Sequence, residues 1–102
     1  MSNQKLLTKE QILKLPDLYQ TDGTDALCQI KLFTPDSHFT WFILECSHED
    51  KDTCFGLVKS YEMELGYFSL GELSSVRGML NLPIEVDESF KPTKLSQIRK
   101  AS

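Results

Sequence analysis

Cysteine and histidine side chains near the middle of the chain are the residues best suited to metal chemistry. Cys46 and His48 are separated by one residue, Cys54 follows six positions after His48, and Cys28 lies on the preceding predicted strand. Thiolate and imidazole groups are the usual protein ligands of zinc. Structural zinc sites combine two close ligand pairs, and the second pair is missing here. The sequence does not determine whether the four side chains converge, but buried thiols and a loop histidine fit the pattern better, so we expect no metal site.

A catalytic thiol would need a cysteine beside a histidine in an electropositive setting. The spacing allows only His48 with Cys46 or Cys54, and acidic residues follow that histidine: Glu49, Asp50 and Asp52. The other histidine, His38, is separated from His48 by a strand of about 26 Å at ~3.3 Å per residue. Two histidines so far apart cannot share one site, and we expect no nucleophilic catalysis.

Three glutamates define a second chemical possibility. Glu45 on one predicted strand and Glu62 or Glu64 on another could meet on one sheet face. Two carboxylates that meet on one face would suit general acid–base catalysis or the binding of a divalent cation. Acidic residues on the solvent side of a sheet are the commoner case, so a carboxylate enzyme or metal-dependent enzyme is kept as an alternative.

Four aromatic residues could form a stacking platform for single-stranded nucleic acid. They lie in predicted strands, at the spacing typical of strands: Trp41, Tyr61, Tyr67 and Phe68. Such platforms combine stacking rings with basic side chains that follow the phosphate backbone. Lysine and arginine are not interleaved with these rings, which favours a role in the core. The five glycines are scattered, so no phosphate-binding loop is predicted.

Four strands are predicted to carry these side chains, at residues 26–33, 39–46, 53–61 and 62–68. Alternation of apolar and polar residues indicates the first, and apolar residues on both faces of 39–46 indicate a central position. Gly66 could break the last strand. Short connections favour an antiparallel meander, because parallel pairing needs long crossovers.

Helices are predicted at three places. Thr8 and Gln11 match the capping-box pattern at the start of a helix, which Pro16 ends. Ser69 and Glu72 match the same pattern and predict the start of a second helix. We expect Gly78 to end the second helix in a left-handed conformation. The apolar segment 79–86 is expected to pack across the sheet, and Thr93 to cap a short last helix.

These elements predict a small α+β domain spanning residues 1–102. The antiparallel sheet has about four strands, with helices at the N-terminus, after the sheet and at the C-terminus. Helices covering one sheet face would leave the other face for partners. The N-terminus lacks a signal-peptide pattern, no apolar run reaches the ~20 residues of a membrane span, and three cysteines cannot all pair. We therefore expect a cytoplasmic protein without membrane contact.

Charge is distributed unevenly along the chain. Residues 1–90 hold seven of the eleven Lys and Arg residues and all fifteen Asp and Glu residues, a formal charge of −8. Residues 91–102 carry four basic residues and no acid. An acidic body repels phosphate backbones, so nucleic-acid binding is expected only through the basic C-terminal tail. The same acidity favours a protein partner with a basic surface.

Residues 54–73 resemble a bacterial family known as domain of unknown function 2958. The most specific part is residues 64–70, Glu-Leu-Gly-Tyr-Phe-Ser-Leu, and the resemblance extends over a core of residues 7–98, leaving 99–102 as a basic tail. It implies an accessory protein of plasmids, conjugative elements or phages. Met79-Leu80-Asn81 departs from the Gly-Pro-rich step expected after Arg77-Gly78.

We therefore expect a binding protein rather than an enzyme, without a cofactor. It would be an accessory protein of a mobile genetic element that binds a host or element-encoded protein, with inhibition of a CRISPR or restriction defence system as a specific hypothesis. The candidate interaction surface consists of Trp41, Glu45, Glu62, Glu64, Tyr67, Arg77 and Glu85.

Overall fold

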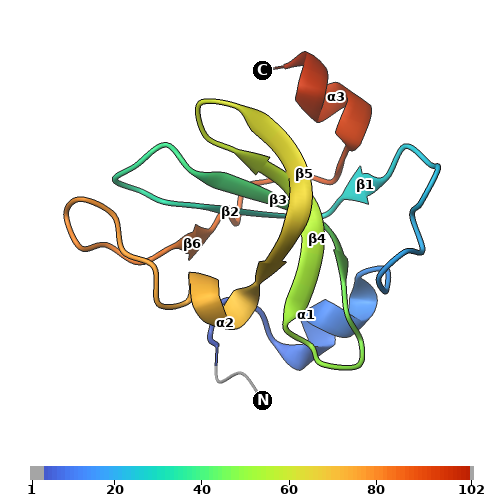
Figure 1. Ribbon diagram of the computed structural model, residues 1–102, viewed down its shortest axis with the longest axis horizontal. Helices are drawn as coiled ribbons and strands as arrows, with labels where there is room; N and C mark the ends of the chain where they lie inside the picture. Colours follow the sequence, from blue (N-terminus) through green and yellow to red (C-terminus); the bar gives the residue numbers. More distant parts are fainter. Residues whose placement is uncertain (1–3, 102) are drawn as a thin grey trace.

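Strand β3 (Thr40–Cys46) forms the centre of a five-stranded antiparallel sheet, in the computed structural model that describes residues 4–101 (Figure 1). The strand order is β5-β4-β3-β2-β6. The other members are β2 (Ile30–Phe33), β4 (Thr53–Lys59), β5 (Met63–Ser69) and β6 (Glu85–Val86). The predicted α+β class, the meander and the central position of residues 39–46 are confirmed. Gly66 does not break β5, whose pairing with β4 is regular.

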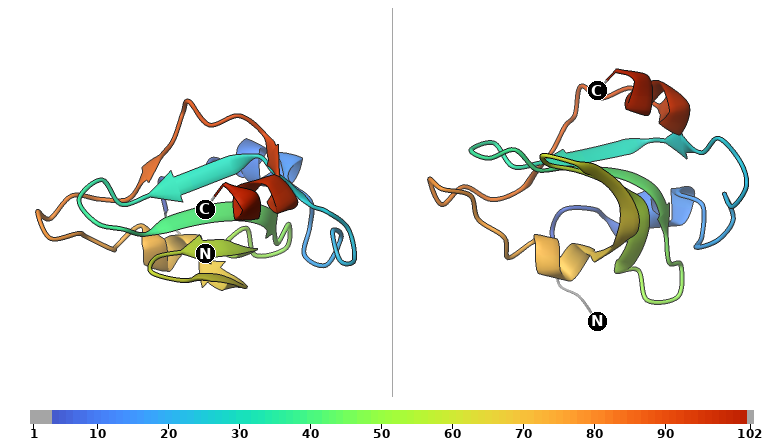
Figure 2. Two further views of the ribbon diagram at one scale, coloured as in Figure 1. Left: turned by 90° about the horizontal axis from the view of Figure 1, so that it is seen from above. Right: turned by 45° about the horizontal axis from the view of Figure 1, so that its top comes forward.

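Two apolar clusters lie on opposite faces of this sheet. The first, on what we call the α1/α2 face, packs Trp41, Ile43 and Cys46 against those two helices. The second, on the α3 face, packs Phe42 and Leu44 against the C-terminal helix. Figure 2 shows helices on both sides of the sheet. The expectation that helices cover only one face was therefore wrong, because β3 carries apolar side chains that need cover on both faces.

A β-bulge in β3 changes which face its last residues occupy. Ile43 pairs with Gly56, but Glu45 pairs with Phe55, so the register shifts at Leu44. An extra residue in one strand breaks the alternation of side chains. Glu45 consequently lies on the α3 face, where strict alternation would have placed it on the α1/α2 face.

The first two helices begin where their caps predict. α1 (Lys9–Lys14) has the full capping box, with the Gln11 amide donating to the Thr8 hydroxyl at 3.1 Å. α2 (Leu70–Leu73) begins after Ser69 but ends well before Gly78. Gly78 does not have a positive φ, so the predicted left-handed helix stop is wrong.

The last helix, α3 (Leu95–Lys100), is capped from a distant loop. Thr93 was predicted to cap it, but Thr93 belongs to β7 (Thr93–Lys94), which pairs with β1 (Leu27–Cys28) in a separate two-stranded sheet. Asp25 accepts hydrogen bonds from the Ser96 amide at 3.0 Å and from its hydroxyl at 2.6 Å. The Asp25 carboxylate thereby supplies an acceptor for the Ser96 N–H, which in the first turn of a helix has no acceptor within the helix.

The remaining differences concern the two ends of the chain. The predicted strand 26–33 is divided between β1 and β2, which belong to different sheets. Residues 99 and 100 are part of α3 rather than a separate tail, and residues 1–3 and 102 lie outside the described part of the chain. Within residues 4–101, no helix has the length and apolar character that a membrane crossing requires.

Candidate protein-binding surface

Residues 78–82 form a tight loop that projects from the molecule between α2 and β6 (Figure 1). The Gly78 amide donates to the Leu82 carbonyl at 3.1 Å, and the Asn81 amide donates to the Gly78 carbonyl at 3.0 Å. Arg77 and Pro83 pair across the base of the loop as an antiparallel bridge. Asn81 adopts a left-handed φ of 63°, which asparagine tolerates better than most residues. The loop is thus a small hairpin with defined geometry.

Asp36, in the turn between β2 and β3, holds this loop from the side. Its Oδ2 accepts hydrogen bonds from the Leu80 amide at 2.6 Å and from the Leu82 amide at 3.4 Å. A Cβ atom at Gly78 would come within 1.6 Å of Asp36 Oδ1, so a larger residue there would displace the Asp36 carboxylate. The turn and the loop are therefore packed together.

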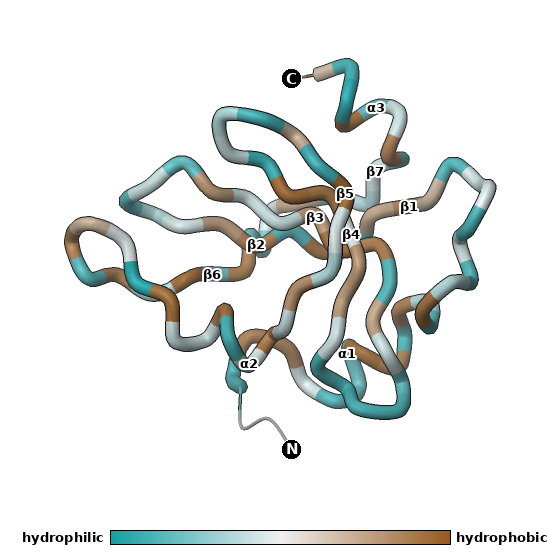
Figure 3. The backbone as a smooth tube through the Cα atoms, in the orientation of Figure 1, coloured by the Kyte–Doolittle hydropathy of each residue, from teal (hydrophilic) through white to brown (hydrophobic). Residues whose placement is uncertain are grey.

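The loop presents large apolar side chains to solvent. Met79 is 92% exposed and Leu80 is 74% exposed, and Leu82 is also exposed. We call residues 79–82 the apolar loop, and Figure 3 shows its hydrophobic positions. Single exposed apolar residues are ordinary on protein surfaces, but a group of them on an ordered projection is typical of interaction sites.

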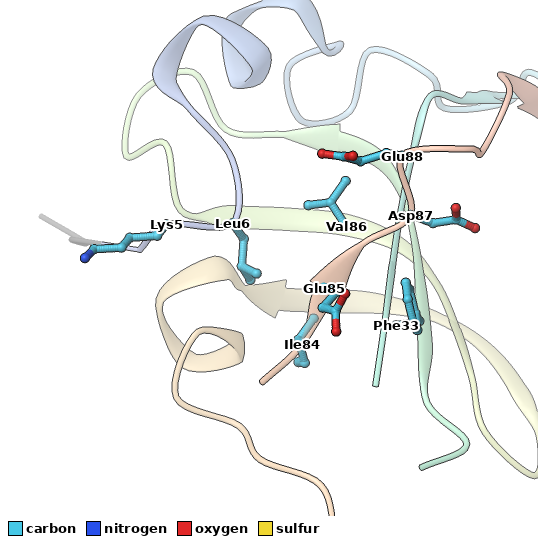
Figure 4. A pocket seen from close by; sticks show the side chains of 8 residues that line it. All are labelled: Lys5, Leu6, Phe33, Ile84, Glu85, Val86, Asp87 and Glu88. Atoms are coloured by element: carbon cyan, nitrogen blue, oxygen red, sulfur yellow. The ribbon is translucent and has the colours of Figure 1, made fainter. Parts of the chain in front are cut away.

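Acidic residues lie around β6, the strand into which the apolar loop leads. Glu85, Asp87 and Glu88 line an open hollow of about 580 Å³ together with Lys5 and Leu6 (Figure 4). Their carboxylates point in different directions in Figure 4 rather than toward one point. Such an arrangement supplies negative charge along a surface and does not resemble a set of metal ligands. The Lys31 Nζ atom lies 3.4 Å from Asp87 Oδ2 and compensates part of this charge.

Two of the predicted surface residues sit close to the apolar loop. Glu85 is exposed on β6, and Arg77 is exposed at the base of the loop. The Arg77 guanidinium donates to the carbonyls of Ser74 at 3.1 Å and of Val76 at 2.8 Å. Arg77 therefore caps the carbonyls that follow α2 while its side chain stays accessible to solvent.

Two other predicted residues are buried and do not lie on the surface. Trp41 belongs to the α1/α2 core cluster, because β3 is the central strand. Glu45 is 2% exposed and accepts hydrogen bonds from the amides of Tyr19 and Thr21, each at 2.8 Å, and from the Thr21 hydroxyl. The carboxylate of Glu45 holds the loop that contains Tyr19, which has a left-handed φ of 70°. Its role is structural in this arrangement.

The proposed carboxylate pair does not form. Glu64 pairs with Val58, whose side chain packs on the α1/α2 face, whereas Glu45 lies on the α3 face. Glu62 is exposed in the turn between β4 and β5 and lines a shallow hollow with Glu64. The expectation that Glu45 meets Glu62 or Glu64 on one face was therefore wrong. The bulge at Leu44 turns Glu45 to the other face, and Glu64 lies in register with Trp41, four residues before Glu45.

Tyr67 is exposed on β5, at the opposite edge of the sheet from the apolar loop. Its ring contacts Tyr19 edge-on with 6.5 Å between centroids and contacts Phe55 at 5.0 Å. Its side-chain hydrogen bond with Tyr19 raises the pKa of Tyr67 above the usual value. The residues predicted as one interaction surface are therefore distributed over two sheet edges and the core.

The cysteines and His48 do not converge. The Sγ atoms of Cys46 and Cys54 are 3.1 Å apart in the α1/α2 cluster, while Cys28 is buried in the α3 cluster. His48 Nε2 lies 2.7 Å from the Leu15 carbonyl oxygen. Within residues 4–101, no group of three or more His, Cys, Asp and Glu side chains is arranged to hold a metal ion.

Sequence reasoning missed the apolar loop. Residues 79–86 were predicted to pack across the sheet, and only Ile84 and Val86 do so, in the α1/α2 cluster. The available signal was Asn81 between Gly78 and Pro83, since these three residue types favour a turn. A turn there places Met79 and Leu80 at its outer end.

Comparisons with known proteins give a family and one distant relative. A family model described as a protein of unknown function (DUF2958) matches residues 5–101. Desmoplakin-B of Danio rerio is 30% identical to this chain over 82 residues, which make up 80% of the chain and 3% of that protein. The chain therefore spans a very small part of the curated relative it matches. No solved structure matches the chain.

Proposed function

The chain belongs to the DUF2958 family, and on that premise we propose that it is a non-enzymatic protein that acts by binding another protein through the apolar loop. The observation that carries the proposal is the exposure of Met79 and Leu80 on a loop held by hydrogen bonds to Asp36. A flexible loop would pay a large entropy cost on binding. A loop that is already ordered keeps that cost small.

Burial of these side chains can supply much of the binding energy. Transfer of one Met or Leu side chain from water to an apolar pocket is worth about 1.5–3 kcal/mol. A few such residues at the centre of an interface commonly dominate its affinity. The complementary surface on the partner would be an apolar pocket that admits Met79 and Leu80.

The chemistry around the loop favours a partner with a basic rim. Glu85, Asp87 and Glu88 line the hollow at β6, the strand into which the apolar loop leads. Charges at the rim of an interface increase the association rate and select against partners of the same sign. The partner would therefore combine an apolar pocket with neighbouring Lys or Arg residues.

We propose further that this partner is a host protein and that the chain is an accessory protein of a mobile genetic element. The support is the family resemblance in residues 54–73, together with a surface suited to docking. By analogy with mobile-element accessory proteins of this size, which often block host machinery, a component of a CRISPR or restriction defence system is the specific candidate.

Quantitative affinity capture from host cells that carry such a defence system tests this proposal. We expect a host protein to be recovered by the unmodified chain and depleted at least about tenfold by Met79→Ser with Leu80→Ser, a loss of about 1.4 kcal/mol or more. Leu13→Ser, at an exposed position of α1, is the matched control and should retain the partner.

Protection of the defended genetic element should follow the same pattern. If expression of the chain raises plasmid or phage survival, the double Ser variant should lose that effect while Leu13→Ser keeps it. Equal recovery of every protein by the double variant and the control would contradict binding through the apolar loop.

A further inference from the structure

Within residues 4–101, strand β5 pairs with another strand on one side only, along a regular run of seven residues, Met63–Ser69. It is the outermost strand of the sheet, with β4 as its neighbour, and their register has no bulge. Figure 2 shows β5 along the outer margin of the sheet. A free edge of this kind is a template for another strand, and proteins usually block it with Lys, Pro or a bulge. β5 contains none of these, and Glu64 is its one charged residue.

Two large side chains of β5 are also only partly covered on the α3 face. Leu65 is 43% exposed and Tyr67 is 56% exposed, and both point to that face. Gly66 lies between them, and a Cβ atom built there would meet nothing within 4 Å. The fold of one copy therefore gives no steric reason for glycine, which is unfavourable in a strand interior.

We propose that β5 pairs antiparallel with β5 of a second copy of this chain, about a two-fold axis at Gly66. In that register Leu65 lies opposite Tyr67 of the second copy, and Glu64 lies opposite Phe68. Met63 lies opposite Ser69, so no charged residue faces a charge of the same sign. Aliphatic–aromatic cross-strand pairs each contribute roughly 0.2–1 kcal/mol, and the symmetry supplies Leu65–Tyr67 twice.

The dimer leaves the proposed docking surface free. β5 and β6 are the two opposite edges of the sheet, and the apolar loop leads into β6. Pairing at β5 would join two five-stranded sheets into one continuous sheet with an apolar loop at each end. The inference depends only on β5, so it can fail while the proposed function holds.

Sedimentation equilibrium of the full chain over a range of concentrations tests the dimer. We expect the apparent mass to rise with concentration from 11.7 kDa toward twice that value. Leu65→Lys with Tyr67→Lys places like charges opposite each other, and Leu65→Glu with Tyr67→Glu does the same. Each variant alone should associate at least about tenfold more weakly, which corresponds to about 1.4 kcal/mol.

Mixing the two variants provides the decisive step. Lysines of one chain then face glutamates of the other, so an equimolar mixture should recover association. Leu13→Lys, on α1 and 51% exposed, is the control and should behave as the unmodified chain. A monomer at all concentrations, or charged variants that associate normally, would overturn the proposal.

A cross-link gives a measurement that does not depend on charged variants folding. Gly66→Cys places the two introduced thiols opposite each other at the axis, where the built Cβ has space. Mild oxidation should yield a covalent dimer, while Gly23→Cys, in a remote loop, should not. No cross-link at position 66 would count against pairing about this axis.

Discussion

The carboxylate of Asp36 accepts a 2.6 Å hydrogen bond from the amide of Leu80, which lies 44 residues further along the chain. One side chain in the turn between β2 and β3 thereby fixes the conformation of the apolar loop. Asp36 Oδ1 is buried against Gly78 and makes no hydrogen bond within the described residues. This relationship explains how an exposed apolar projection remains ordered.

Replacement of Asp36 by Ala should loosen the apolar loop without unfolding the sheet. Hydrogen bonds of this type contribute about 1 kcal/mol each to a folded conformation. We expect amide hydrogen exchange at Leu80 and Leu82 to accelerate while exchange in β3 stays unchanged. Unchanged protection of both amides would show that Asp36 does not hold the loop.

Replacement of Glu45 by Gln should destabilise the loop that contains Tyr19. The carboxylate accepts from two backbone amides and one hydroxyl, and an amide NH₂ group would face donors instead. We expect the free energy of unfolding to fall by about 2 kcal/mol, measured by chemical denaturation. Glu49→Gln, exposed in the next turn, is the control and should have little effect.

Replacement by Ala should have very different effects on stability at two glycines that pair with each other across β4 and β5. A Cβ atom at Gly56 would approach the Phe42 carbonyl oxygen to 2.0 Å, inside the sheet, whereas the space at Gly66 is open. We expect Gly56→Ala to lower the melting temperature strongly. Gly66→Ala should change the free energy of unfolding by less than about 1 kcal/mol. Similar effects at both positions would contradict the packing described for Gly56.

Replacement of Asp25 by Ala should loosen the packing of helix α3 against the sheet. Donation from the Ser96 hydroxyl and amide lowers the pKa of Asp25 below its usual value of 3.8. The stability that this carboxylate contributes is therefore present above pH 3.8 and is lost as the pH falls through its lower folded-state pKa. Amide exchange at Ile98 should accelerate in the variant at neutral pH, while Asp22→Ala should leave it unchanged.

The three thiols should be unreactive in the native protein. Burial raises the pKa of Cys28 to about 12, and the pKa of Cys54 is raised by its hydrogen bond to Cys46 and by burial. Only the thiolate reacts with disulfide reagents. We expect no modification at pH 8 without denaturant, and rapid reaction of all three thiols after unfolding. Because the Cys28 thiol ionises near pH 9.0 in the unfolded chain, its burial also makes the protein less stable as the pH rises from about 9 toward 12.

Local patterns predicted the elements of this fold because they depend on neighbouring residues. The capping box at Thr8 and the apolar residues on both sides of β3 required only the sequence. The bulge at Leu44 and the remote cap from Asp25 depend on strand pairing and on a loop far away in sequence. The bulge moved Glu45 to the other face, and the strand register placed Glu64 beside Trp41 rather than Glu45, so the predicted carboxylate pair does not form.

The most direct test of binding through the apolar loop is site-specific photo-cross-linking in host cells. A photoreactive amino acid at position 80 should yield one cross-linked host protein, and excess unmodified chain should compete it away. The same amino acid at position 13 should not yield that product, and the double Ser variant at positions 79 and 80 should not compete. If positions 80 and 13 gave the same products, the apolar loop would not be the binding surface.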